Sequence, residues 1–130
     1  MKKLPRDFND VKEEIGMVDE RLPPHSDEVE RAVLGCVLND SATLTTISER
    51  VKGDVTVFYD FRHQAVYRAM VEVEDALDPV DLITVQQRLK SRGDLERIGG
   101  IAYLTEMQDC VPSVANLPAY LDELMEQALR

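Results

Sequence analysis

Residues 23–38 read Pro-Pro-His-Ser-Asp-Glu-Val-Glu-Arg-Ala-Val-Leu-Gly-Cys-Val-Leu, and this stretch predicts the start of the first core helix. The two prolines stop an earlier helix from running in, because the residue before a proline disfavours helical geometry. Ser26 can accept a hydrogen bond from a free amide of the first turn. Three acidic residues, Asp27, Glu28 and Glu30, place negative charge at the positive end of the helix dipole. We therefore expect a helix directly after Ser26.

Apolar residues beyond this cap fall on one helical face that requires a core to bury against. They are Val29, Ala32, Val33, Cys36 and Val37. The same spacing predicts further helices at about residues 44–53, 60–75, 81–93, 101–111 and 116–130. We expect Asp60, Asp81 and Asn116 to cap the helices that they precede, and Gly93 to end the helix before it. Residues 55–59 are interpreted as an extended connection that carries Phe58 and Tyr59 into the core. The sequence thus predicts an all-α fold of about five to six helices.

The chain has 130 residues, which is the usual size of one domain, and its formal net charge is -10. DNA-binding proteins neutralise phosphates with clustered cations, and here the basic residues are scattered among acidic ones. We therefore expect basic protein partners rather than nucleic acid, and weak single-strand DNA binding at most. Cys36 and Cys110 are predicted to be free thiols. With no apolar leader or membrane span, the protein is expected to be soluble and cytoplasmic.

Residues 1–22 are predicted to be a mobile N-terminal arm, and residues 23–112 a globular helical domain. Within the arm, Phe8, Val11, Ile15 and Val18 repeat at intervals of three or four. This pattern is typical of a short amphipathic helix that docks on another surface, although Gly16 weakens it.

The last predicted helix carries a wide apolar stripe, which is the candidate partner or self-association surface. The stripe consists of Leu117, Tyr120, Leu121, Leu124, Met125, Ala128 and Leu129. Ordinary core packing is the alternative interpretation. No glycine, asparagine or proline closes the helix before Arg130, so we expect the natural chain to continue.

Catalytic motifs are absent from the sequence. There is no phosphate-binding Gly-x-x-x-x-Gly-Lys-[Ser/Thr], and no spacing of His and Cys typical of a metal site. His25 and His63 are predicted to be structural or exposed; a small helical hydrolase using His63 with a carboxylate is an alternative. Gly99-Gly100 is interpreted as a turn with positive backbone angles rather than an anion site. We assign no catalytic, cofactor or metal residue.

Several fragments, in order and at consistent spacing, cover nearly all of the chain except the arm. They are Pro23-Pro24-His25-Ser26 with Glu30 and residues 32–35; Phe58-Tyr59 with His63, Val66, Tyr67 and Ala69; residues 79–85 with Leu89; Gly99-Gly100 with residues 102–104; and Pro112-Ser113 with Ala115-Asn116, Ala119-Tyr120 and Arg130. Together they resemble the N-terminal domain of bacterial replicative DNA helicases of the DnaB type. Two departures are Val57, where that family often has an acid, and Leu121, where it usually has a small residue.

The resemblance implies a small orthogonal helical bundle followed by a helical hairpin, of which residues 113–130 would be the first arm, cut before the second. It implies a non-catalytic collar domain of a hexameric helicase that unwinds DNA at the replication fork. Implied partners are the C-terminal domain of primase, a helicase loader and other copies of the chain. DNA would be bound only by the full-length ring, and ATP and Mg by a motor domain that this sequence lacks. Alternatives are the helicase-binding domain of a primase and a free-standing helical adaptor.

Overall fold

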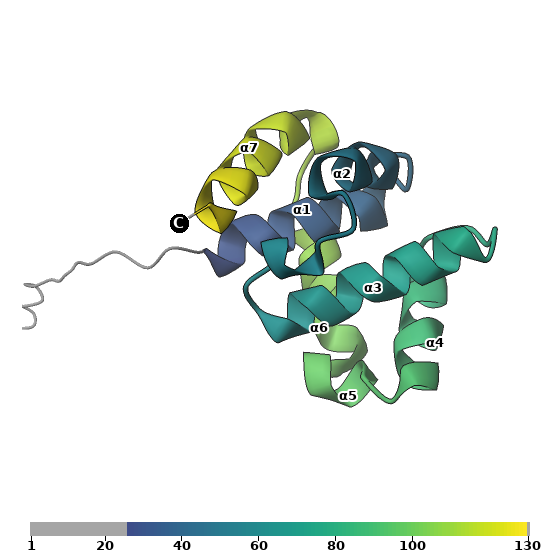
Figure 1. Cartoon of the computed structure of the whole chain (residues 1–130). Coiled ribbons are helices and arrows are strands. Elements are labelled where there is room, and N and C mark those ends of the chain that lie inside the picture. The colour runs from purple at the N-terminus through teal and green to yellow at the C-terminus, as the bar shows by residue number, and fades with distance from the viewer. Residues whose placement is uncertain (1–25, 130) are drawn as a thin grey trace, which may run out of the picture.

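The computed structural model describes residues 26–129, and every regular element in that range is helical (Figure 1). The elements are α1 (Asp27–Asn39), α2 (Thr43–Val51), η1 (Val55–Val57), α3 (Phe61–Asp75), α4 (Leu82–Arg92), α5 (Leu95–Ile98), α6 (Gly100–Asp109), η2 (Val114–Asn116) and α7 (Leu117–Ala128), where η marks a 3₁₀ helix. The all-α prediction is confirmed. The structure adds the one-turn helix α5 between the two helices predicted at residues 81–93 and 101–111. The predicted arm and His25 lie outside the described residues.

Helix α1 is the centre of the bundle and contacts α2, α3, α6 and α7. Figure 1 shows α7 and α2 along one side of it and the group α3 to α6 on the other. The Ser26 hydroxyl accepts a hydrogen bond from the Val29 amide, so the predicted cap is confirmed. Every residue from Val33 to Leu38 is buried, so this part of α1 is covered on all sides and not on one face alone. Val29 and Ala32, predicted to be core, are only partly buried.

Capping residues define the other helices much as the sequence predicts. The Asp60 carboxylate accepts from the Arg62 amide at the start of α3, and Asp81 and Thr84 form a capping box on α4. Gly93 ends α4 at φ 80°, in the left-handed region that glycine adopts freely. Asn116 was expected to cap the last helix, but its side chain makes no such bond. Instead the Ser113 hydroxyl caps η2, which leads directly into α7.

The connection at residues 55–59 differs from its predicted form. Residues 55–57 form η1, a turn closed by the Asp54 carboxylate accepting from the Thr56 amide. Phe58 is fully buried as predicted, whereas Tyr59 is 63% exposed, so its prediction as a core anchor was wrong. The physical reason is local: the Tyr59 amide turns inward to donate to the Glu30 carboxylate, and the ring points outward.

Helices α1 and α6 pack closely together at Gly35. A Cβ atom built on Gly35 would lie 2.3 Å from the Met107 carbonyl oxygen, so only glycine fits. The same end of α1 is joined to α6 through side-chain amides: the Asn39 Nδ2 donates to the Gln108 carbonyl at 2.9 Å, and the Gln108 Nε2 donates to the Leu38 carbonyl at 3.2 Å. These bonds satisfy polar backbone groups at the helix end.

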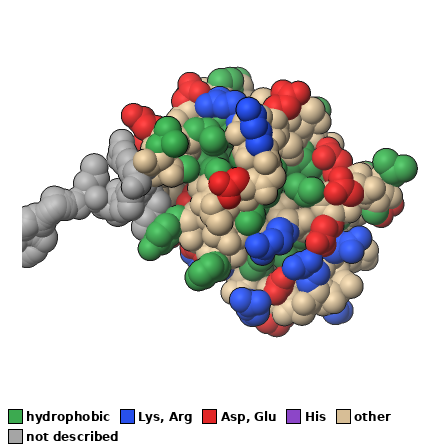
Figure 2. All heavy atoms as spheres, in the orientation of Figure 1, with side chains coloured by type: hydrophobic (Ala, Val, Ile, Leu, Met, Phe, Trp, Pro, Cys, Tyr) green, Lys and Arg blue, Asp and Glu red, His purple; other side chains and the backbone are tan. Residues whose placement is uncertain are grey.

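Among residues 26–129, no helix is both long and apolar enough to cross a bilayer. On the face shown in Figure 2, acidic and basic side chains alternate over the surface instead of forming a patch of one sign.

Candidate functional site: a buried polar network and a groove over α1

Glu30 and His63 are the two buried polar side chains of the described core, with 1% and 0% of their surface exposed. His63 Nδ1 lies 2.6 Å from Glu30 Oε1, and His63 Nε2 lies 2.7 Å from the Tyr103 hydroxyl. The Glu30 carboxylate also accepts from the backbone amides of Tyr59 at 2.7 Å and Asp60 at 3.3 Å. One network therefore joins α1, α3 and α6, and the side chains of Glu30 and His63 both have partners, as their burial requires.

Arg62 covers the outer side of this network. Its guanidinium binds the Asp60 carboxylate at 2.6 Å and lies 4.7 Å from the centre of the Tyr103 ring. The hydrogen bond from Arg62 lowers the pKa of Asp60 to about 2, against a smaller opposing effect of burial. Burial raises the pKa of Tyr103, and the nearby Arg62 charge partly offsets that rise. The phenol therefore stays protonated and available for its hydrogen bond to His63.

The geometry of this network indicates that His63 has a structural role. Both ring nitrogens of His63 are bonded and the ring is fully buried, so no face of the histidine is open to a substrate. Asp27, Glu30 and His63 each offer a ligand atom within 4.8 Å of the others. However, two ligands on one tetrahedral zinc lie about 3.3 Å apart, farther than the 2.6 Å of the Glu30–His63 contact. The structural interpretation of His63 is thus favoured over the hydrolase alternative.

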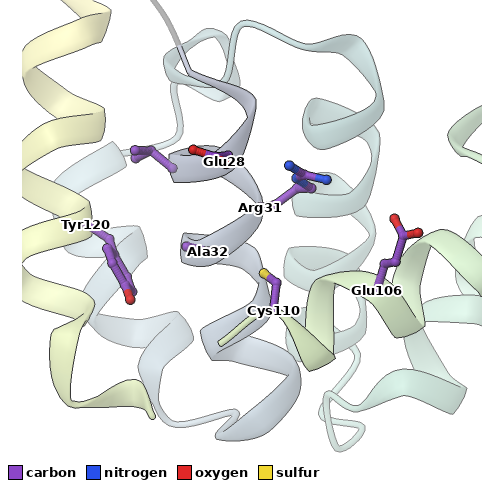
Figure 3. A pocket seen from close by; sticks show the side chains of 7 residues that line it. Glu28, Arg31, Ala32, Glu106, Cys110 and Tyr120 are labelled. Carbon is purple, nitrogen blue, oxygen red and sulfur yellow. The ribbon is translucent and has the colours of Figure 1, made fainter. Parts of the chain in front are cut away.

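A groove of about 540 Å³ follows the outer side of α1 between α6 and α7 (Figure 3). Its floor is formed by Glu28, Val29, Arg31 and Ala32 of α1. Glu106 and Cys110 form the wall on the side of α6, and the Tyr120 ring forms the wall on the side of α7. The groove therefore lies over the first half of α1, where Val29 and Ala32 are only partly covered.

Charge in the groove is uneven. Arg31 Nε is buried without a hydrogen-bond partner, the one such side-chain atom among the described residues. Burial raises the pKa of the Cys110 thiol, and the positive charge of Arg31 works in the opposite direction. In Figure 3 the side chains of Arg31 and Glu106 lie on one side of α1, and Tyr120 on the other. The lining therefore holds one cation, Arg31, and two carboxylates, Glu28 and Glu106.

The predicted stripe on the last helix divides into two parts. Leu117, Leu121 and Leu124 are buried in the domain's own core. Tyr120 and Met125 are partly buried, Ala128 is exposed and Leu129 is 87% exposed. The self-association surface remains a prediction, and only these last four residues are available to it. Gly99 and Gly100 have φ of 108° and 74°, which confirms the turn between α5 and α6.

Sequence reasoning missed Glu30, Tyr103 and Arg31. The sequence predicts a favourable first-turn charge for Glu30, and the resemblance includes Glu30 without a role, although this residue directly follows Val29 at the edge of an apolar face. Its partner His63 is 33 residues away, and no local spacing connects them. The available signal was a histidine within an apolar helical stretch, which requires a buried partner.

Comparisons with known proteins agree over most of the chain. A sequence model described as the DnaB-like helicase N terminal domain matches residues 22–126. The chain is 42% identical over 113 residues to the replicative DNA helicase DnaB of Geobacillus stearothermophilus, covering 87% of this chain and 24% of that protein. It is 40% identical to the DnaB of Haemophilus influenzae, covering 83% of this chain and 23% of that protein. The chain thus spans about a quarter of the length of these relatives.

A solved structure shares the fold. The crystal structure of the N-terminal domain of DnaB helicase from Mycobacterium tuberculosis superposes with a TM-score of 0.77 at 35% identity, covering 83% of this chain and 77% of that one.

Proposed function

Because the chain belongs to the family of DnaB-like helicase N-terminal domains, we propose that it forms part of the collar of a hexameric replicative DNA helicase. In this role it pairs with neighbouring copies and binds primase, a helicase loader and other primosome proteins. ATP and Mg²⁺ would act in a motor domain of the parent protein, which unwinds DNA in the cytoplasm at the nucleoid. The observation that carries the proposal is the family match over residues 22–126, which includes nearly every described residue.

Features of the chain itself support a role in protein contacts. The exposed end of α7 presents Leu129 and Ala128 next to the partly buried Met125. An exposed apolar helix end is suited to pairing with another helix. The net charge of -10 favours basic protein partners, and the alternating surface charges in Figure 2 give no continuous basic track for DNA on that face.

Self-association is tested by sedimentation velocity across a wide range of protein concentration. We expect a weak, concentration-dependent dimer that the double variant Ala128→Glu/Leu129→Glu abolishes. Ile83→Glu is the matched control, because Ile83 is an exposed apolar residue, 58% exposed, on α4. If Ile83→Glu abolished the dimer and the double variant at the end of α7 kept it, the pairing surface would include α4 and not the end of α7.

Primase binding is tested by titrating the chain with the C-terminal domain of the primase from the same genome, using calorimetry. No heat of binding, with the chain folded by circular dichroism, would count against primase as the partner.

The coding sequence after Arg130 separates the collar from a free-standing adaptor. A second apolar helix followed by Gly-x-x-x-x-Gly-Lys-[Ser/Thr] is expected for the collar, and a stop codon for the adaptor. The alternative of a primase domain finds no support in the family match.

A further inference from the structure

The turn between α3 and α4 exposes a leucine in an unfavourable backbone conformation. Leu77 is 92% exposed and has a φ of 64°, in the left-handed region that residues other than glycine and asparagine rarely adopt. Figure 1 shows this turn projecting beyond the rest of the bundle. The strain and the exposed apolar side chain both cost free energy in the isolated chain. A partner that buries Leu77 would recover the second of these costs.

The residues beside Leu77 in the sequence carry negative charge. Asp75 and Asp78 are both exposed, and neither carboxylate makes an ion pair or a side-chain hydrogen bond within residues 26–129. The turn therefore presents one apolar side chain with two free carboxylates close by. An apolar pocket with a cation at its edge would complement it.

A pocket of this kind lies between α2, η1 and α3, and we call it the α2–α3 pocket. Its volume is about 340 Å³. Val55 and Val71 contribute apolar surface that the described helices only partly bury. The hydroxyls of Ser48 and Tyr67 lie 3.1 Å apart and bond to each other, so neither requires an external partner. The complete lining is Ser48, Gly53, Val55, Tyr67, Arg68, Val71 and Glu72.

The charged residues of the α2–α3 pocket leave one cation unneutralised. Glu72 is bound by Arg92 at 2.6 Å and lies 3.9 Å from Arg88, so its charge is already compensated. Arg68 is exposed and forms neither an ion pair nor a hydrogen bond with any other residue that the structure describes. A free arginine beside apolar walls favours an occupant that combines an apolar side chain with a carboxylate.

We infer that Leu77 of one copy of the chain inserts into the α2–α3 pocket of a second copy, where Asp75 or Asp78 lies beside Arg68. Every copy carries both the turn and the pocket, so the two surfaces can pair between identical chains. One leucine and one exposed ion pair give weak binding, with a dissociation constant of about 1 mM. The contact therefore acts where copies are held close together, and it is separate from the pairing proposed at the end of α7.

The contact is tested by NMR with two forms of the full chain, both carrying Ala128→Glu/Leu129→Glu so that the end of α7 cannot pair. The isotope-labelled receiver also carries Leu77→Asn and so offers only its pocket, because asparagine tolerates the left-handed backbone and removes the apolar side chain. The unlabelled donor keeps Leu77 and is added to about 2 mM, twice the expected dissociation constant. We expect the amide signals of Gly53, Val55 and Val71 in the receiver to shift along a saturable curve.

Variants of the donor and the receiver separate this contact from others. Leu77→Asn in the donor is expected to weaken binding by about tenfold or more, because the buried side chain is lost. Arg68→Gln in the receiver is expected to weaken it by about twofold to threefold at low salt. Ile83→Asn in the donor is the matched control, since Ile83 is an exposed apolar residue on α4, and it should leave binding unchanged.

The inference would be overturned if the intact donor shifted none of the pocket signals, or if the Leu77→Asn donor shifted them equally. Neither result would affect the pairing at the end of α7, because sedimentation at micromolar concentration tests that pairing on chains that keep Ala128 and Leu129.

Discussion

The two ends of α1 are held in place by different means. At its start, the Glu30 carboxylate is bonded to His63 and to two backbone amides, and the outer surface is an open groove. At its end, residues 33–38 are surrounded by apolar side chains, and Gly35 lies against the backbone of α6. Hydrogen bonds fix direction but cost desolvation, whereas close packing supplies stability and tolerates no added atom. One helix therefore combines a polar tie with a tight apolar contact.

Removing the hydrogen bonds of the Glu30 carboxylate should have the largest effect on stability. Glu30→Ala leaves the His63 ring and the amides of Tyr59 and Asp60 without their acceptor in a buried site. We expect a loss of about 3–5 kcal/mol in the free energy of unfolding, measured by urea denaturation. Glu30→Gln, which keeps one acceptor oxygen, should lose less. A loss below about 1 kcal/mol in Glu30→Ala would show that these hydrogen bonds do not hold the start of α1.

Crowding the apolar end should have the next largest effect. Gly35→Ala places a methyl group where the Met107 carbonyl oxygen is 2.3 Å away, so α1 and α6 must separate. We expect a loss of about 2–3 kcal/mol, again from urea denaturation. Gly53→Ala is the control for the loss of a glycine, since nothing lies within 4 Å of its added Cβ, although its φ of 81° adds some strain. A Gly35 variant no less stable than the control would contradict the close approach.

Acid should weaken the polar end selectively. Asp60 has its pKa lowered from 3.8 to about 2 by Arg62, so the stability it contributes is complete above pH 4 and is lost as the pH falls toward 2. At neutral pH, Asp60→Asn should cost about 1 kcal/mol, allowing for solvent screening at this partly exposed site. The difference from the original chain should disappear near pH 2. The stabilities of the two proteins are compared by thermal unfolding at each pH. A difference in stability that is the same at every pH from 2 to 6 would argue against the ion pair as its source.

The exposed ion pair between Asp27 and Arg62 should contribute least to stability. Asp27 lies 3.8 Å from Arg62, and about half of its side chain is exposed. Asp27→Ala removes this weak ion pair and one charge of the first turn, so we expect a loss of about 0.5 kcal/mol that shrinks in high salt. A loss as large as that of Glu30→Ala would mean that Asp27 belongs to the buried network.

Sequence reasoning predicted the parts of this comparison that depend on neighbouring residues. Ser26, Asp60, Asp81 and Gly93 act within one helical turn, and the helix boundaries they predict agree with the structure. Helix α5 was missed because four residues contain too little periodicity.

The candidate site was harder to predict because it depends on residues far apart in the chain. Glu30 and His63 meet only after α1 and α3 pack, and the groove exists only between α1, α6 and α7. The apolar stripe on α7 correctly predicted a helix. It did not predict which of its residues are buried in the domain's own core.

The long span closed by the hydrogen bond between Ser26 and Gln127 has a consequence for biosynthesis. These residues are 101 positions apart, and α1 packs on both α6 and α7. On the ribosome, α1 is made first, yet its buried face is completed only when α7 has left the exit tunnel. Local helices can form during translation, but the cooperative core must wait for α7, and contacts this distant in sequence slow folding. The chain is therefore expected to stay sensitive to proteases, and to depend on chaperones that shield apolar segments, until α7 emerges.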